Sequence, residues 1–450
     1  MKPIYKLLSL AVCLMIIIDV QNAFAQKSKD KPADTTKKEQ PAKPEEDAAT
    51  PDMKVTTPDP NAFYADKAVY TFDILNPSNK PQDGKVSYQV FSETGQKLNF
   101  DSLKVNVDKK ANKKYTFEIP EAKPGFYKVN LMMNITDDDD TARRVFGIRP
   151  EQIRSPYKKP VDFEMFWQTA KDELAKVKPS FKTTFIKDSL NRKIYAIEMQ
   201  SLGNMTIRGW MTIPKAGGKN RKFPVWVGLP GYQVNLTPIM ADDDNLAIIT
   251  LNVRGQGNSR GPIDTRRDEY ICYHIENKDN YVMRGAIMDC VRCIDYVFSR
   301  SDLRHDDVFV TGGSMGGFLS MATAALDKRV TICSAQNPIF SDVRNLIGEV
   351  DWPMSDIIKY AKTRPGLTMD KVLNNMDYFD VKNFATDITC STLMGIGLLD
   401  PLAPPNNEYA AYNNLSGKKR IMVFKDLGHE VNQVFATLEA RWMMDTFALF

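Results

Sequence analysis

The sequence of 450 residues is poor in the side chains that bind metal ions. It has three histidines and six cysteines, and the cysteines do not form the two CxxC pairs of a zinc site. An excess of charge is also missing, because 60 basic and 56 acidic residues leave a formal charge of +4 with the signs interspersed. No overall field therefore attracts nucleic acid or an acidic membrane surface. We expect a local site that uses no metal and no cofactor.

The apolar run near the start of the chain, residues 7–18, is too short to span a bilayer. Two lysines precede it, and Ala23-Phe24-Ala25 provides small residues for cleavage before Gln26. We therefore predict that residues 1–25 are a signal peptide and that the mature chain is exported to the periplasm or the medium. The residues before Cys13 resemble a lipoprotein acylation site, but the bulky valine next to it disfavours lipid anchoring.

Residues 26–60 contain six prolines, no aromatic residue and a balanced mixture of charges, which predicts a disordered linker. From 61 to 149, apolar and polar residues alternate between turn signals, as in 86–90 and 115–119. About six strands with one buried face predict a small all-β, immunoglobulin-like sandwich domain. The adjacent aspartates at 137–140 lack the alternating spacing of a calcium loop, and we expect a solvated hairpin tip there.

The pattern changes at about residue 150, where strands begin to alternate with helical stretches. Most of the later strand candidates are short, continuous apolar runs, as in strands covered on both faces. For residues 150–450 we predict a three-layer α/β domain with a mostly parallel sheet of eight strands. The candidates are residues 193–201, 206–214, 223–229, 246–253, 308–311, 330–334, 392–398 and 420–425.

Two segments match GxSxG, the pattern that places a nucleophilic serine on a tight turn between a strand and a helix. The one centred on Ser259 precedes a proline and a charged run, so no helix begins there and we expect a loop. Ser314 stands between the apolar strand 308–310 and an alanine-rich helix at 318–326, as the turn requires. Such a turn projects the hydroxyl at the carboxyl edge of the sheet, and the start of the helix directs free amides to the same point. Ser314 is therefore the predicted nucleophile.

A serine hydroxyl needs a base to remove its proton, and a histidine with a pKa of about 6.5 is suited to this. In this kind of sheet the chain order is nucleophile, acid, base, and His429 is the one histidine after Ser314. The orienting carboxylate should follow the seventh strand candidate, where Asp400 precedes a proline. Asp387 and Asp426 remain rivals, although the first precedes that strand and the second is close enough to His429 to favour a turn role.

A tetrahedral oxyanion requires two N–H donors. One should be the amide of Met315, the residue after the nucleophile. The other should come from the glycine-containing turn at 229–233 after the third strand candidate, and we favour the amide of Tyr232. The ring of Tyr232 is more simply interpreted as a wall of the pocket.

Several motifs taken together resemble the acetyl xylan esterase and cephalosporin-C deacetylase family of carbohydrate esterases. They are Arg254-Gly255-Gln256, the glycine-rich turn around Ser314, Leu399-Asp400 and His429-Glu430, and the resemblance extends from about residue 156 to the C-terminus. It implies an α/β-hydrolase fold and the removal of acetyl groups from sugar hydroxyls or similar small alcohols.

By the same resemblance, the triad is Ser314, Asp400 and His429, and the oxyanion donors are the amides of Tyr232 and Met315. Arg254 and Gln256 would brace the active-site loops. Two features depart from the family: Met315 stands where glutamine is usual, and the segment 257–280 is shorter in a region that helps to build the family's ring-shaped oligomer. A homo-oligomer is thus an open expectation.

These observations predict an exported serine esterase acting on acetylated sugars such as xylo-oligosaccharides. A serine peptidase of the same fold is one alternative, but its propeller gate needs several hundred residues and about ninety are available. The other alternative is a carbohydrate-binding protein with a relic hydrolase domain, against which the filled triad positions argue. Cys290 and Cys293 stand three apart, and we interpret them as buried helix positions rather than a redox pair.

Overall fold

A computed structural model describes residues 50–449 except 217–220, 242–243, 264–268 and 431. The predicted signal peptide, Cys13 and most of the predicted linker lie outside the described residues. The described chain divides into two compact units, the first ending at residue 153 and the second beginning at residue 154. No helix within the described ranges has the length and apolar character needed to cross a membrane.

The first unit contains eight strands in two sheets, with the orders β1-β3-β6 and β2-β8-β7-β4-β5. Alternate residues of β3 are buried in a core that both sheets share, as the period of two predicted. Of the aspartates at the predicted hairpin tip, Asp137 lies in the turn between β7 and β8, and the other three begin β8. The strands are β1 (Asp52–Thr56), β2 (Phe63–Tyr64), β3 (Lys67–Asn76), β4 (Gln82–Phe91), β5 (Lys97–Val107), β6 (Ala111–Pro120), β7 (Gly125–Ile135) and β8 (Asp138–Ile148).

Strand β1 lies in the segment that the sequence predicted to be a disordered linker, so that prediction is wrong for residues 52–56. Met53 is buried and Val55 is half-buried, and β1 pairs with β3 in antiparallel register. A strand of five residues hardly changes the polar composition of residues 26–60, so composition alone did not reveal it. For residues 61–149 the prediction was about six strands, and the structure has seven, β2 to β8, of which β2 has only two residues.

The second unit is built on a nine-stranded sheet with the order β17-β16-β15-β14-β12-β13-β11-β10-β9. Strands β12 to β17 are parallel to their neighbours among themselves, and β11, β10 and β9 continue the sheet in antiparallel pairs. The strands are β9 (Lys182–Ser189), β10 (Arg192–Ser201), β11 (Met205–Pro214), β12 (Phe223–Gly228), β13 (Ala247–Asn252), β14 (Leu303–Gly313), β15 (Ile332–Gln336), β16 (Ser391–Gly397) and β17 (Lys419–Phe424).

All eight strand candidates are present, but the predicted number of eight is wrong because β9 adds a ninth. β9 forms the edge of the sheet, and six of its eight residues are exposed. Its sequence therefore shows no alternation that would mark a buried face. In contrast, every residue of β12 and β13 is buried, which explains their continuous apolar runs.

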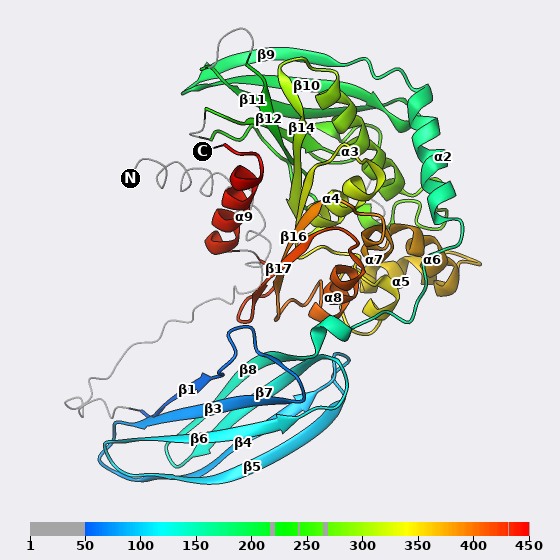
Figure 1. Ribbon diagram of the computed structural model, residues 1–450. Helices are drawn as coiled ribbons and strands as arrows, with labels where there is room; N and C mark the ends of the chain where they lie inside the picture. Colours follow the sequence, from blue (N-terminus) through cyan, green and yellow to red (C-terminus); the bar gives the residue numbers. More distant parts are fainter. Residues whose placement is uncertain (1–49, 217–220, 242–243, 264–268, 431, 450) are drawn as a thin grey trace, which may run out of the picture. The chain divides into compact units, whose positions relative to one another are not determined.

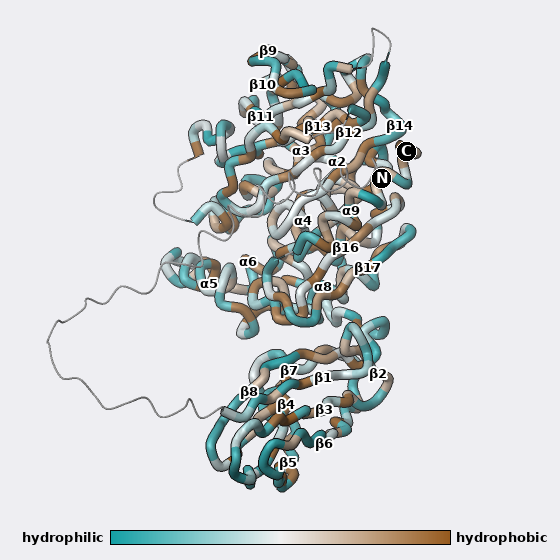
Figure 2. The backbone as a smooth tube through the Cα atoms, turned by 90° about the vertical axis from the view of Figure 1, so that its left-hand side faces the viewer, coloured by the Kyte–Doolittle hydropathy of each residue, from teal (hydrophilic) through white to brown (hydrophobic). Residues whose placement is uncertain are grey.

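Helices lie on both sides of this sheet (Figure 1), with α9 on one side and α3 and α4 on the other. Figure 2 shows hydrophobic residues concentrated where the strands and helices meet, and hydrophilic residues on the outer loops. The helices are α2 (Phe163–Lys176), α3 (Val282–Phe298), α4 (Met315–Leu326), α5 (Met354–Lys362), α6 (Met369–Met376), α7 (Val381–Ala385), α8 (Pro405–Asn414) and α9 (Gln433–Thr446), with short 3-10 turns that include η2 (Leu202–Asn204), η3 (Gly257–Ser259) and η4 (Tyr270–Cys272).

The direction of the strands decides where the polar residues meet. Since β12 to β17 are parallel, their carboxyl ends lie at one edge of the sheet. The segments that follow β12, β14, β16 and β17 carry Tyr232, Ser314, Asp400 and His429 in that order. The topology therefore brings residues from four distant segments to one edge.

Candidate active site

Ser314 occupies the turn between β14 and α4, with backbone angles φ 58° and ψ −119°. This positive φ is strained for a residue with a side chain and is typical of functional turns. The Ser314 amide donates to the carbonyl of Gln336 on β15 at 2.8 Å, which holds the turn in place. A methyl group at Gly312 or Gly316 would lie 2.7 or 2.5 Å from the carbonyl oxygen of Leu229. Only glycine at both positions lets the turn approach the end of β12.

Asp400, His429 and Ser314 form a continuous path of hydrogen bonds. His429 Nδ1 is 2.7 Å from Asp400 Oδ2, and His429 Nε2 is 2.8 Å from Ser314 Oγ. The other carboxylate oxygen of Asp400 accepts the amides of Leu402 and Ala403 at 2.8 and 2.9 Å. When Nδ1–H donates to the carboxylate, Nε2 is left as the acceptor for the serine hydroxyl. The arrangement can move a proton from Ser314 to the imidazole.

The loops that carry Asp400 and His429 are tied to each other. The amide of Leu399 donates to the carbonyl of Leu427 at 2.9 Å, and a methyl group at Gly397 would collide with the carbonyl of Gly428. The two rival aspartates lie elsewhere. Asp387 pairs with Lys159 at 2.7 Å, and Asp426 lies 3.6 Å from Lys425. The carboxylate that His429 contacts is that of Asp400.

We call the tight turn at Ser314, between β14 and α4, the elbow. The turn that follows β12 lies against the elbow, since the Leu229 amide donates to the carbonyl of Thr311 at 2.9 Å. This places the predicted donor Tyr232 on the same edge as Met315, the first residue of α4. The ring of Tyr232 packs on Trp352 with centroids 4.9 Å apart, and its hydroxyl donates to Glu269 at 2.9 Å. Burial raises the pKa of Tyr232. The ring is thus held by Trp352 and Glu269, and its predicted role as a wall of the pocket stays a prediction.

The segment after β13 connects α3 to the elbow. Arg254 donates from Nε and Nη2 to the fully buried Asp289 of α3 at 2.9 and 2.7 Å, and its backbone amide adds a third bond. Gln256, two residues later, directs its amide nitrogen to the sulfur of Met315 at 3.6 Å. A thioether is a weak acceptor. Arg254 therefore anchors this segment firmly, whereas the contact of Gln256 with the elbow is weak.

The second GxSxG serine has a structural role. Ser259 ends the 3-10 turn η3, and no α-helix begins there, as predicted. Its hydroxyl accepts the amide of Arg208 at 2.6 Å on β11 and donates to the carbonyl of the same residue.

Cys290 and Cys293 are buried in α3, as predicted, and burial raises the pKa of both thiols.

Sequence reasoning missed the carboxylate behind the elbow. Glu439 of α9 is fully buried and accepts the hydroxyl of Thr311 at 2.6 Å, and both of its oxygens lie 3.4 Å from the Gln336 side-chain amide. Gln336 is also the residue whose carbonyl holds Ser314. Burial raises the pKa of Glu439, although these hydrogen bonds lower it in part. Glu439 stands four residues after Phe435 and shares its face of α9, but the burial of that face is seen only in the structure.

A second buried carboxyl group, Glu408 of α8, lies close enough to Asp400 to sense its charge. Neither of its carboxyl oxygens has a hydrogen-bond partner among the described residues. Burial, and then the negative charge of Asp400, raises the pKa of Glu408 well above its ordinary value. The folded protein therefore keeps Glu408 protonated to a higher pH than the unfolded chain does.

The Glu408→Gln variant should gain stability relative to the wild type as the pH rises from 5 to 8. A carboxyl group whose pKa is raised on folding contributes stability at low pH that is lost as the pH rises, and an amide has no such loss. The difference in the free energy of unfolding should grow by up to about 1.4 kcal/mol per pH unit. Urea unfolding at a series of pH values measures it, and a difference that stays flat or falls would contradict the assignment.

Comparison with known proteins identifies the family of this chain. Residues 150–446 match the protein family described as acetyl xylan esterase (AXE1). An acetyl esterase, Axe7A, of Xylanibacter ruminicola is 31% identical over 319 residues, which cover 67% of this chain and 70% of that protein.

Two solved structures are similar to the second unit. The acetyl xylan esterase from Paenibacillus sp. R4 is 25% identical with a TM-score of 0.61, over 66% of this chain and 98% of that chain. Acetyl xylan esterase 1 from Thermoanaerobacterium sp. JW/SL YS485 is 27% identical with a TM-score of 0.60, over 66% and 97%. The chain belongs to the acetyl xylan esterase family and is a carboxylic ester hydrolase with an α/β-hydrolase fold.

Proposed function

We propose that this chain is an exported serine esterase that removes acetyl groups from acetylated xylo-oligosaccharides or related small acetyl esters. Ser314, His429 and Asp400 are the proposed triad. The family supports an acetylated carbohydrate as the substrate class. The assignment of residues rests above all on the path of hydrogen bonds of 2.7 and 2.8 Å from Asp400 through His429 to Ser314.

In the first half of the reaction, His429 Nε2 takes the hydroxyl proton while Ser314 Oγ attacks the acetyl carbon. The carbonyl electrons move to the oxygen, and the amides of Met315 and Tyr232 are the proposed donors to that oxyanion. Asp400 stabilises the imidazolium. When the intermediate collapses, the bond between the acetyl carbon and the sugar oxygen breaks, and His429 gives its proton to that oxygen.

The second half repeats these steps with water. His429 takes a proton from the water as its oxygen attacks the acetyl group on Ser314. The bond to Ser314 Oγ then breaks, the proton returns to that oxygen, and acetate leaves. These steps need no metal or organic cofactor.

The elbow depends on a hydrogen-bond network behind it as well as on the triad in front. Glu439 holds Thr311 and Gln336, the residues at the ends of the two strands that position Ser314. Glu439 belongs to α9, which begins four residues after His429. We therefore assign Glu439 the role of a positioning residue that couples the helix after the base to the strand before the nucleophile.

The remaining proposals concern the first unit and the cell. The two sheets of β1 to β8 support an immunoglobulin-like sandwich, whose partner the contacts do not identify. The apolar run and the small residues before Gln26 support export without a lipid anchor at Cys13. We also propose that this chain forms a homo-oligomer.

Ser314→Ala should lower hydrolysis of 4-nitrophenyl acetate by at least about 10⁴-fold, because it removes the nucleophile. Ser259→Ala, at the second GxSxG motif, is the matched control and should stay within a few-fold of the wild type. Acetate release from acetylated xylo-oligosaccharides should follow the same order. Inactive wild type would favour the relic binding protein, a preference for peptide esters would favour the peptidase, and an active Ser314→Ala would refute the triad.

Glu439→Leu should lower kcat for 4-nitrophenyl acetate by about tenfold, the effect of losing a buried hydrogen bond of about 1.4 kcal/mol. Glu439→Gln keeps an acceptor for Thr311 and should stay within about threefold by the same measure. Thr311→Val removes the donor instead and serves if the leucine variant does not fold. Equal kcat values for all of these variants, at unchanged thermal stability, would leave Glu439 without the assigned role.

Export predicts a defined N-terminus. Protein recovered from the periplasm or the medium of the producing cell should begin at Gln26, because the small residues before it suit the cleavage site. N-terminal sequencing of the intact mature chain measures this. A chain that retains Met1 and stays in the cytoplasm would contradict the proposal.

A further inference from the structure

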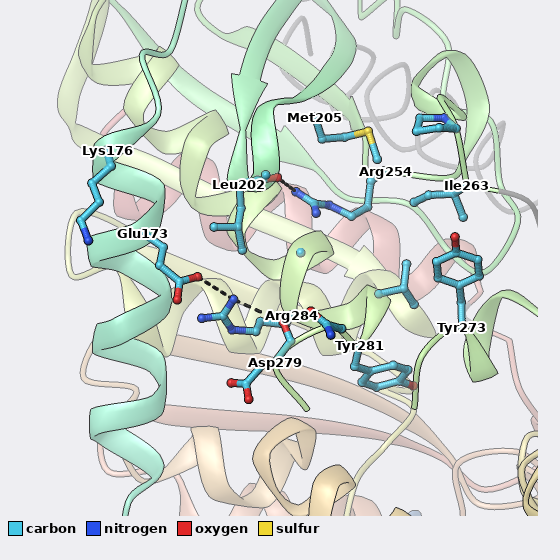
Figure 3. Close-up of a pocket in the computed structure, with 15 residues that line it drawn as sticks. Glu173, Lys176, Leu202, Met205, Arg254, Ile263, Tyr273, Asp279, Tyr281 and Arg284 are labelled. Atoms are coloured by element: carbon cyan, nitrogen blue, oxygen red, sulfur yellow. Dashed lines mark hydrogen bonds and ion pairs between the residues drawn. The ribbon is translucent and has the colours of Figure 1, made fainter. Parts of the chain in front are cut away.

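The second unit has a cavity of about 610 Å³ that none of the proposed triad and oxyanion residues lines. We call it the Arg284 cavity (Figure 3). It lies between α2, the turn η2, the segment after β13 and the start of α3. Among its lining residues are Glu173, Lys176, Met205, Arg254, Tyr273 and Arg284. Its volume falls in the range of sites that bind small molecules, about 300 to 1,000 Å³.

The Arg284 cavity is linked to the sheet edge that carries the triad. Arg254, one of its walls, follows β13 at the carboxyl end of that strand. Strand β13 is parallel to β12, which is parallel to β14. Two residues further along the chain, Gln256 contacts Met315 at the elbow. A ligand in this cavity would touch the same segment that contacts the elbow.

The charges that line the cavity cancel. Arg254 is paired with the buried Asp289. Arg284 is paired with Glu173, which reaches across from α2 at 2.8 Å (Figure 3). Lys176 and Asp279, both exposed, contribute one charge of each sign. Because no net charge remains among the described lining residues, we expect the cavity to favour a neutral ligand over an anion.

The lining also offers two kinds of surface. Leu202, Met205 and Ile263 are only partly buried and provide apolar contacts, with the half-buried ring of Tyr273 beside them. Side-chain N–H groups and carboxylates provide the polar rim. A sugar ring matches this combination, since its C–H faces pack on apolar and aromatic groups while its hydroxyls both donate and accept.

Arg284 is a fixed part of this wall. Its side chain is 6% exposed and donates from Nη1 to Glu173 and to the carbonyl of Asp279. Its Nε has no partner among the described residues. A buried donor left without a partner costs about 1 to 3 kcal/mol. Glu173 and the carbonyl of Asp279 thus fix the orientation of the guanidinium, and its unpaired Nε is buried and not open to a ligand.

We propose that the Arg284 cavity binds a neutral sugar unit of a xylo-oligosaccharide, as a saccharide site separate from the triad. The choice of sugar rests on the proposed function, whereas the cavity and its neutrality do not. The site would retain substrate or product chains beside the elbow, and it has no catalytic step of its own.

The test uses the full chain with Ser314 blocked covalently by a serine-directed organophosphate, so that the active site is closed. Xylotriose, which carries no acetyl ester, is titrated by calorimetry and by ligand-observed NMR. We expect binding to persist in the blocked protein. Tyr273→Ala should weaken it at least tenfold, while Tyr157→Ala, an exposed tyrosine outside the cavity, should leave it unchanged.

A second variant protects the test against misfolding. Lys176→Ala lies on the exposed side of α2 and should weaken binding about threefold without a change in thermal stability. Three outcomes would overturn the proposal. They are loss of xylotriose binding when Ser314 is blocked, binding as tight as that of the wild type in both Tyr273→Ala and Lys176→Ala, and no xylotriose binding by the wild type. Failure of the esterase assignment would appear separately, as missing acetate release, because xylotriose has no ester to cleave.

Discussion

The hydrogen-bond path from Asp400 through His429 to Ser314 is the interaction on which the account of this esterase depends. Each residue comes from a different loop, and each loop follows a strand of one parallel set. His429 can take the proton of Ser314, with Asp400 stabilising the imidazolium, only if the two donor–acceptor distances stay near 2.8 Å. The remainder of the second unit can be understood as the means of holding those distances.

Backbone contacts help to fix the three loops. The strained turn at Ser314 is held by the carbonyl of Gln336, and the close approach to Leu229 excludes any side chain at two neighbouring glycines. The Asp400 loop is bonded to the His429 loop through Leu399. Behind them, the mostly buried Arg254 and the fully buried Glu439 have strong partners. Buried groups of this kind give fixed orientation because leaving them unpaired is costly.

The sequence could predict the residues whose position follows from strand order. Ser314 was found because a strand precedes it and a helix follows it, and His429 because it is the one histidine beyond the nucleophile. Asp400 needed the additional rule that the acid follows the strand before last. The edge strand β9 was not predicted because a mostly exposed strand shows no alternation of apolar and polar residues. Strand β1 was not predicted because it is short and lies within a polar segment.

The burial of two carboxyl groups could not be predicted from the sequence, for a different reason. Glu408 and Glu439 stand on helices, where a glutamate is most often exposed, and their burial depends on neighbours from other segments. Likewise, the charge balance of the Arg284 cavity depends on Glu173 and Asp289, which come from two helices. Such partners become known only when the helices are packed, because local periodicity carries no information on what faces them.

The most direct test of the central claim is mass spectrometry of the enzyme after acid quenching during turnover of an acetyl ester. The account predicts one acetyl group on the peptide that contains Ser314, and none on that peptide in a His429→Ala variant treated for the same time. An acetyl group on another residue, or wild-type accumulation without His429, would contradict the proposed path from carboxylate to hydroxyl.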